Sequence, residues 1–162
     1  MPSLPLPRRT VLRAGTALAV SVPLAGCGLL DTGPAAPDPV TEVLRALWGR
    51  ERDLVTHYDA AIAALPSLRA TLAPVRADHA AHADAVRAVL DARGPRATPS
   101  PSRPDAAPPG PGDRATVLAG LARAEAGART AATAAALLAE GDTAALLASI
   151  AACESTHLVV LR

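Results

Sequence analysis

Six acidic and histidine side chains interrupt the apolar helical pattern of this chain, and their types are those of metal ligands. Apolar residues recur at helical spacing through four segments, and near the middle of each segment a Glu or a His takes an apolar position. The interrupting residues are Glu51, His79, His82, Glu125, Glu154 and His157. If the four segments align in a bundle, these carboxylates and imidazoles meet at one level, where they could hold a metal ion.

The spacing of two pairs supports a shared site. His79 and His82 are three residues apart, as are Glu154 and His157. Residues at this spacing project from one helix face on successive turns, so both members of a pair can reach the axis of the bundle. The donor set suits iron as one or two ions, and it also suits zinc, copper or manganese.

A metal-free polar network is the alternative interpretation of the same residues. Buried Glu and His can satisfy one another through hydrogen bonds, whereas an unpaired buried charge costs several kcal/mol. Like charges at one level also raise carboxyl pKa values. Without cations, some of Glu51, Glu125 and Glu154 would therefore be protonated or paired with imidazolium, and three histidines are available for that.

Four helices are needed to position these residues, and cap and breaker residues predict their ends. Asp38 and Asp113 are suited to be N-caps, as is Asp142, while Pro39 is pre-set for a first helical position. Pro66, Gly94 and Gly141 are expected to end the first three helices. The predicted helices span residues 39–65, 67–93, 113–140 and 142–162.

The connection lengths predict the topology. The first two helices, and the last two, are joined so tightly that each pair forms an antiparallel hairpin. The segment 94–112 is rich in Pro and lacks periodicity. At an extended rise of about 3 Å per residue it can cross a bundle whose helices are about 35–40 Å long. The sequence therefore predicts an all-α four-helix bundle with one long Pro-rich crossover between two hairpins.

The composition favours closely packed helices and gives no electrostatic case for nucleic acid. Hydrophobic residues make up 50% of the chain but aromatics only 1%, and the formal net charge is +1. Most of the apolar content is Ala with Leu and Val, which suits close helix packing. No basic stripe interleaved with aromatic residues is present.

The N-terminal residues predict export and a lipid anchor. Arg8-Arg9-Thr10-Val11-Leu12 resembles the twin-arginine translocation motif, and Leu24-Ala25-Gly26-Cys27 resembles the bacterial lipobox, whose cysteine is acylated. The apolar run between them is too short for an ordinary transmembrane helix. We therefore expect a signal peptide over 1–27, lipidation of Cys27, a flexible tether over 28–38 and a helical domain over 39–162. The expected location is the outer face of the cytoplasmic membrane.

The combined features resemble the ferritin-like superfamily over about residues 38–162. The twin-arginine signal, the lipobox and the C-terminal Leu-Leu-Ala-Ser-Ile-Ala-Ala-Cys-Glu-Ser-Thr-His segment are similar to actinobacterial ferritin-like proteins of the DUF4439 type. In di-metal members, two helices each give one Glu and two others each give Glu-x-x-His. Glu51, Glu125 and the Glu154/His157 pair match this pattern, and His82 matches a terminal His. His79 departs from it, because it stands where a bridging Glu is expected.

Three functions are open, and the resemblance bears on the first of them. With bound iron, the implied chemistry is oxidation of ferrous iron by oxygen or peroxide. A non-catalytic envelope protein that binds a partner, or itself as a homo-oligomer, is the alternative, and the extra histidine also suits a copper or zinc scavenger. Three neighbouring residues carry weaker expectations. Tyr58 is expected to be a core residue with its hydroxyl at the rim, or else a redox-active or hydrogen-bonding tyrosine of the site. Asp78 is expected to be a solvent-facing carboxylate or a partner of His82, and Cys153 a packing residue.

Overall fold

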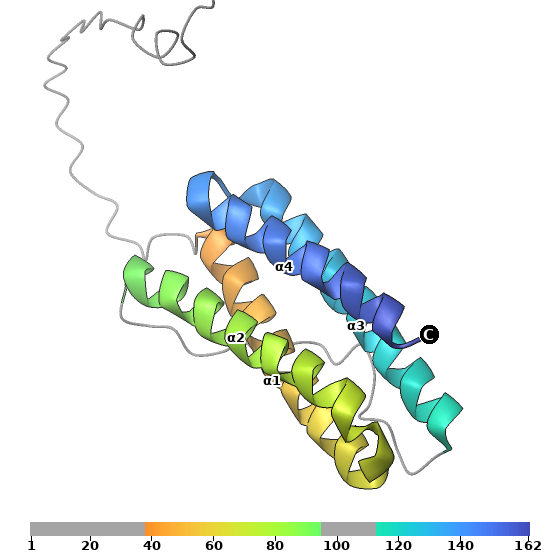
Figure 1. Ribbon diagram of the computed structural model, residues 1–162. Coiled ribbons are helices and arrows are strands. Elements are labelled where there is room, and N and C mark those ends of the chain that lie inside the picture. Colours follow the sequence, from red (N-terminus) through yellow and green to blue (C-terminus); the bar gives the residue numbers. More distant parts are fainter. Residues whose placement is uncertain (1–37, 95–112) are drawn as a thin grey trace, which may run out of the picture. The chain divides into compact units, whose positions relative to one another are not determined.

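The computed structural model describes residues 38–94 and 113–162, all within one compact unit of the chain, Ala36–Arg162. These residues form four α-helices and one 3₁₀ turn, with no strand among them. The helices are α1 (Pro39–Ala64), α2 (Arg69–Arg93), α3 (Arg114–Leu138) and α4 (Gly141–Val160), and the turn η2 is Pro66–Leu68 (Figure 1). The predicted all-α class is confirmed. The predicted signal peptide 1–27, and nearly all of the tether 28–38 and the crossover 94–112, lie outside the described residues.

Two of the predicted N-caps are confirmed. The Asp38 carboxylate accepts a hydrogen bond from the Val40 amide at 3.1 Å, and the Asp113 carboxylate accepts one from the Thr116 amide at 2.8 Å. Each cap satisfies an amide that has no carbonyl partner within its helix. Pro39 occupies the first position of α1, where no intrahelical hydrogen bond is lost.

Three helix ends differ from the sequence prediction. α2 begins at Arg69, because residues 66–68 form a 3₁₀ turn after α1 instead of the first turn of α2. α3 ends at Leu138, and α4 begins at Gly141, so Asp142 is not an N-cap but lies in the first turn of α4. Gly141 has a φ of 56°, a left-handed conformation that glycine adopts without strain. From the first turn, the Asp142 carboxylate still faces the positive end of the helix dipole.

The apolar core consists of two clusters, which together fix the helix directions. Cluster A joins the C-terminal half of α1 to the N-terminal halves of α2 and α3 and to the residue that follows α4. Its buried members are Leu54, Tyr58, Ala61, Ile62, Leu68, Leu72, Val75, Val117, Leu121, Ala124, Ala128 and Leu161. Cluster B joins the N-terminal halves of α1 and α4 to the C-terminal halves of α2 and α3. Its buried members are Leu44, Leu47, Trp48, Ala83, Val86, Leu90, Ala132, Ala135, Leu147 and Ile150.

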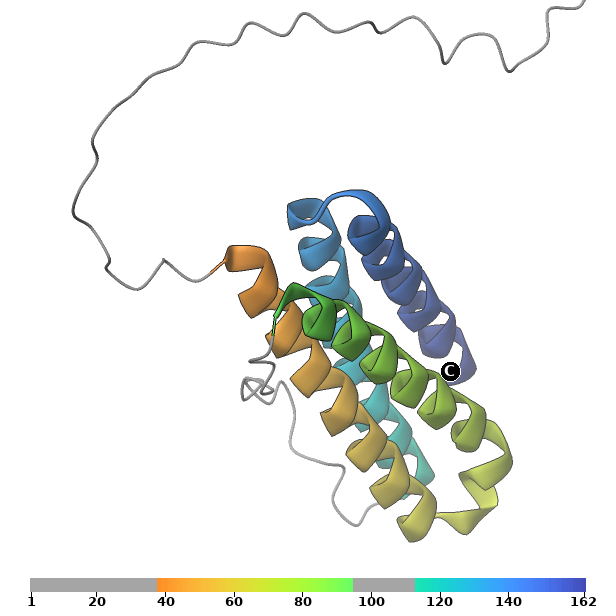
Figure 2. The ribbon, with the colours of Figure 1, turned by 90° about the vertical axis from the view of Figure 1, so that its left-hand side faces the viewer.

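This arrangement confirms the predicted topology. α1 runs antiparallel to α2, α3 runs antiparallel to α4, and α2 and α3 are parallel (Figures 1 and 2). α1 packs against α2 and α3, and α4 packs against α3 and α2. Two antiparallel hairpins with parallel second and third helices are the connectivity of the ferritin-like bundle, in which one connection must run the length of the bundle.

By length and composition α4 would be able to span a membrane, and it is the one helix in the described part of the chain that would. This is weak evidence for a span, since core helices of bundles have the same composition. α4 packs against two other helices and carries Glu154 and His157 into the core. In the described structure α4 is thus one of the four helices of the bundle.

Candidate metal centre

The six predicted residues lie where clusters A and B meet, and every helix contributes at least one of them. Glu51 is on α1, His79 and His82 are on α2, Glu125 is on α3, and Glu154 and His157 are on α4. Five of the six are buried. His157 has 2% of its surface exposed, and no surface is exposed on Glu51, His79, Glu125 and Glu154. The His82 side chain is 14% exposed. The predicted convergence on the bundle core is therefore present in the structure.

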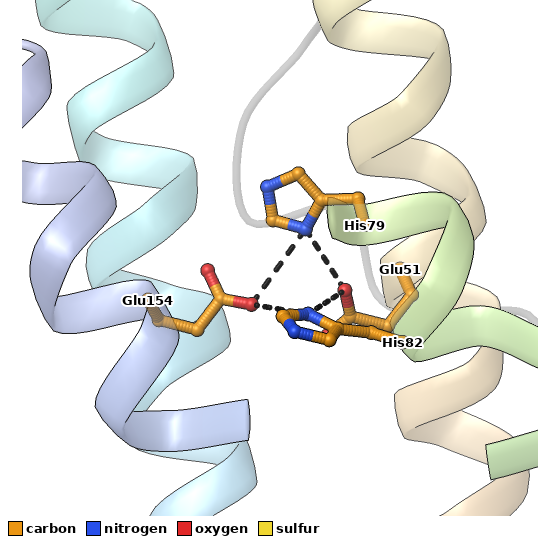
Figure 3. Close-up of side chains that lie close together, drawn as sticks. All are labelled: Glu51, His79, His82 and Glu154. Carbon is orange, nitrogen blue, oxygen red and sulfur yellow. Dashed lines mark hydrogen bonds and ion pairs between the residues drawn. The ribbon is translucent and has the colours of Figure 1, made fainter. Parts of the chain in front are cut away.

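A first ligand group, which we call group 1, consists of Glu51, His79, His82 and Glu154 (Figure 3). His79 Nδ1 lies 2.9 Å from Glu51 Oε2 and 3.6 Å from Glu154 Oε1. His82 Nδ1 lies 3.5 Å from the same Glu51 oxygen and 3.4 Å from the same Glu154 oxygen. Four potential donor atoms from three helices thus surround one point.

A second ligand group, group 2, consists of His79, Glu125, Glu154 and His157. His79 Nε2 lies 2.8 Å from Glu125 Oε1. His157 Nδ1 lies 3.3 Å from Glu125 Oε2 and 3.5 Å from Glu154 Oε2. The two groups share His79 and Glu154, so they are adjacent.

Tyr58 belongs to the site, and the expectation that its hydroxyl lies at the rim is wrong. The side chain has no exposed surface, and its hydroxyl donates a hydrogen bond to Glu125 Oε1. Burial, together with the negative charge of Glu125, raises the pKa of Tyr58, so the hydroxyl keeps the proton that it donates. The sequence feature that indicated a place in the site is the position of Tyr58 on the apolar stripe of α1, two turns beyond Glu51.

Asp78 and Cys153 approach the outer nitrogen of His157. Asp78 Oδ2 lies 3.3 Å from His157 Nε2, and Cys153 Sγ lies 3.4 Å from the same atom. The Asp78 side chain is 52% exposed, as expected for a solvent-facing carboxylate, but the ring that it contacts is His157 on α4 and not His82. His57 is half-buried and belongs to neither group.

A comparison with protein families decides the relationship of this chain. A family model described as a ferritin-like domain matches residues 49–162. The chain belongs to this ferritin-like family. No curated protein and no solved structure gives a match. All six residues of the two groups fall within the matched part of the ferritin-like chain.

Charge pairing dominates the electrostatics of this ferritin-like core. Burial acts to lower the pKa of each site histidine, but the facing carboxylates outweigh it and raise the pKa of His79 to about 9, of His82 to about 10 and of His157 to about 11. Burial acts to raise the carboxyl pKa values, and hydrogen bonds with the histidines reverse this for Glu51 and Glu125, whose pKa is lowered. Glu154 keeps a raised pKa. Three imidazolium rings facing the carboxylates are thus the favoured metal-free state.

Hydrogen bonding in the ferritin-like core is nevertheless incomplete. The polar atoms that lack partners show whether the site suits a metal ion. Four buried atoms of the two groups have no hydrogen-bond partner within the described residues: Glu51 Oε1, both Glu154 carboxylate oxygens and His82 Nδ1. Buried carboxylate oxygens without donors are costly, and a cation would pair with them directly. Carboxylate oxygens with imidazole nitrogens are ligands for iron, manganese, zinc and copper, so the residues present fit a metal ion.

Proposed function

We propose that this ferritin-like protein binds metal at groups 1 and 2 and uses it to oxidise ferrous iron with oxygen or peroxide. The observation that carries the proposal is the convergence of three buried carboxylates and three histidines from four helices, with Glu154 left without a hydrogen-bond donor. Bound iron would supply the one-electron chemistry that these side chains lack. The identity of iron is taken from the family, because the donor set alone also accepts zinc, copper and manganese.

The protein's own residues have distinct roles in this proposal. Glu51, Glu125 and Glu154 would hold the cations, and His82 and His157 would be terminal nitrogen ligands. Tyr58 would orient Glu125, since its hydroxyl donates to one oxygen of that carboxylate. Clusters A and B exclude water from the site on both sides, which strengthens every electrostatic contact within it.

We further propose that the protein acts at the outer face of the cytoplasmic membrane. The support is the sequence alone: Arg8-Arg9 with the following Thr-Val-Leu resembles a twin-arginine signal, and Leu24 to Cys27 resembles a lipobox. An acyl chain on Cys27 would anchor the helical domain through the segment 28–38. The same features, with the C-terminal segment, favour the DUF4439 type within the ferritin-like superfamily.

A non-catalytic envelope module is the second candidate. Its first support is that the core contains as many histidines as carboxylates. Three imidazolium rings can neutralise the three carboxylates without any metal. Its second support is the exposed apolar surface at the end of α3, where Leu137 and Leu138 are 83% and 57% exposed. Two exposed leucines side by side would give a protein partner or a second copy an apolar point of contact.

Two measurements separate these candidates. Elemental analysis of protein purified from its native envelope should find iron at one or two ions per chain, and the purified protein should consume oxygen or peroxide as it oxidises ferrous iron. Thermal melts with Fe, Mn, Zn and Cu should each be compared with melts in chelator. If none of these metals raises the melting temperature while Glu154→Ala lowers it, the metal-free module is the correct assignment.

A further inference from the structure

We infer that His79 is shared by two metal ions, with Nδ1 as a ligand of the ion at group 1 and Nε2 as a ligand of the ion at group 2. The inference rests on the proposed metal-binding function and deepens it, because it assigns the number of ions and the group between them. The resemblance to di-metal ferritin-like proteins implies a bridging carboxylate at position 79, and this inference puts a bridging imidazole in its place.

The orientation of the His79 ring carries the first part of the argument. Figure 3 shows one ring nitrogen turned toward Glu51 and Glu154 and the other turned away from both. The first, Nδ1, is 2.9 Å and 3.6 Å from those two carboxylates, and the second, Nε2, is 2.8 Å from Glu125. Each nitrogen therefore faces a different set of anionic ligands, and the ring fills the space between the sets.

The distances within group 1 are those of ligands around one ion. Ligands about 2.0–2.1 Å from a tetrahedral centre lie about 3.3–3.4 Å from one another. The four measured separations between imidazole nitrogens and carboxylate oxygens are 2.9, 3.4, 3.5 and 3.6 Å. Three of them are too long for good hydrogen bonds, yet all are suited to a common cation.

The Glu154 carboxylate faces both groups, as the His79 ring does, with one oxygen toward each. Its Oε1 faces the two histidines of group 1, and its Oε2 lies 3.5 Å from His157 in group 2. The side chain has no exposed surface, and neither oxygen has a hydrogen-bond partner within the described residues. A fully buried carboxylate with one free oxygen aimed at each group is the arrangement that two cations would complete.

Charge supports two ions bridged by a deprotonated ring. Glu51, Glu125 and Glu154 supply three negative charges against the four positive charges of two divalent cations. If both ring protons of His79 pass to water when the ions bind, the imidazolate supplies the fourth negative charge and the buried site is neutral. The three carboxylates alone would leave one uncompensated positive charge among side chains of which five have at most 2% exposed surface.

A shared ring also changes the expected separation of the ions. Ions bound about 2 Å from each nitrogen of one imidazole lie about 6 Å apart. Two-metal sites without a bridging ring commonly hold their ions about 3.5–4 Å apart. Each group offers two imidazole nitrogens and two carboxylate oxygens, a mixed donor set that suits iron as well as copper and zinc.

Titration with copper(II) tests the bridge, because two copper ions joined by imidazolate couple their unpaired electrons. The full-length chain should carry Cys153→Ser in every sample, since Cys153 lies 3.4 Å from His157 and would add a soft copper ligand. The first equivalent should give an electron paramagnetic resonance signal of about one unpaired electron per chain, and the second should bind and abolish most of it. Zinc in place of the second copper should preserve the signal, because zinc has no unpaired electron.

Matched variants assign the two positions. His82→Gln removes a ligand of group 1 alone and His157→Gln one of group 2 alone, so each should retain about one copper with an uncoupled signal. His79→Gln should abolish coupling, while His57→Gln, a histidine outside both groups, should behave as the parent. Circular dichroism identifies any variant that does not fold, and the titration of the parent decides the question without the variants.

The outcomes separate this inference from the proposed function. Binding of two copper ions with loss of the signal supports the shared ring. Binding of two ions whose signals add, or of a single ion, overturns it and leaves the metal-binding function standing. No binding of copper, zinc, iron or manganese at all overturns both.

Discussion

Tyr58 and His79 share one hydrogen-bond acceptor, Glu125 Oε1. The Tyr58 hydroxyl donates to this oxygen from α1, and His79 Nε2 lies 2.8 Å from it on α2. One carboxylate on α3 thus fixes the orientation of two side chains on two other helices. The only tyrosine of the chain is in this way part of the candidate metal centre and not only of cluster A.

Tyr58→Phe should destabilise the metal-free protein while leaving its fold intact. The substitution keeps the ring in cluster A but removes a donor from a buried carboxylate, which costs about 1–3 kcal/mol. Urea denaturation in the presence of chelator measures the free energy of unfolding. A value equal to that of the parent would show that Glu125 does not depend on the tyrosine.

Glu154→Gln should remove most of the stabilisation that metal gives. Both groups share the Glu154 carboxylate, and neither of its oxygens has a hydrogen-bond donor within the described residues, so the substitution takes a ligand from each group. In the parent, metal at a hundredfold excess over its dissociation constant should add about 2.7 kcal/mol. Melting curves with and without metal measure this difference. Glu140→Gln, at an exposed position before α4, is the control, and an undiminished metal effect in Glu154→Gln would exclude Glu154 as a ligand.

The metal-free protein should lose stability as the pH rises above about 6.5. The pKa values of His79, His82 and His157 are raised to about 9, 10 and 11, so the folded state binds these protons more tightly than the unfolded chain. Their stabilisation is complete below the unfolded pKa and is lost as the pH rises through the folded values. The raised pKa of Glu154 acts in the same direction. Denaturation in chelator at several pH values measures the trend, and a stability that increases toward pH 10 would contradict the charge pairing.

Metal affinity should have the opposite pH dependence. Imidazole nitrogens must lose protons before they bind a cation, so metal competes with the three protons that stabilise the metal-free core. Affinity should therefore increase from about pH 6 to pH 8. Calorimetric titration at each pH measures both the affinity and the number of protons released. Binding that is independent of pH would place the metal away from the histidines.

Cys27→Ala should release the protein from the membrane or leave an unprocessed precursor. The lipobox cysteine is the predicted acylation site, and Cys153, the other cysteine of the chain, lies on α4 within the helical bundle. Membrane fractionation and the mass of the product measure the effect. A variant that is processed and sediments with membranes like the parent would refute the lipid anchor.

The fold and the level of the site could be predicted from the sequence because both depend on periodicity. Stripes of apolar residues, two Asp caps and the lengths of the connections determine which helices pair and in which direction. A Glu or His at mid-stripe is then forced into the core, as it is for Glu51, His79 and Glu125. These features can be read from the order of residues along the chain alone. They require only that the apolar positions of each helix are assigned correctly.

The contacts inside the site could not be predicted, because they depend on the rotation of each helix about its axis and on side-chain rotamers. Asp78 was paired with His82 from their spacing along α2, whereas its carboxylate contacts His157 on the adjacent α4. The hydrogen bond of Tyr58 with Glu125 joins residues that are far apart in the sequence. The different surroundings of the two His79 ring nitrogens depend on all four helices together and have no signature in any one of them.

The six charged and histidine residues of groups 1 and 2 form a polar layer between clusters A and B. This layer also determines how the four helices align along their axes. If any helix slid by one turn, its Glu or His would move out of the layer and into a cluster lined by Leu, Ala and Val. An unpaired charge in such surroundings costs several kcal/mol, which is more than small apolar side chains gain from alternative packing. A core that is rich in alanine and nearly free of aromatic residues has few large side chains to fix its register. Its charged layer supplies that register, so replacing all six residues by leucine should yield a helical protein whose helices no longer share one alignment.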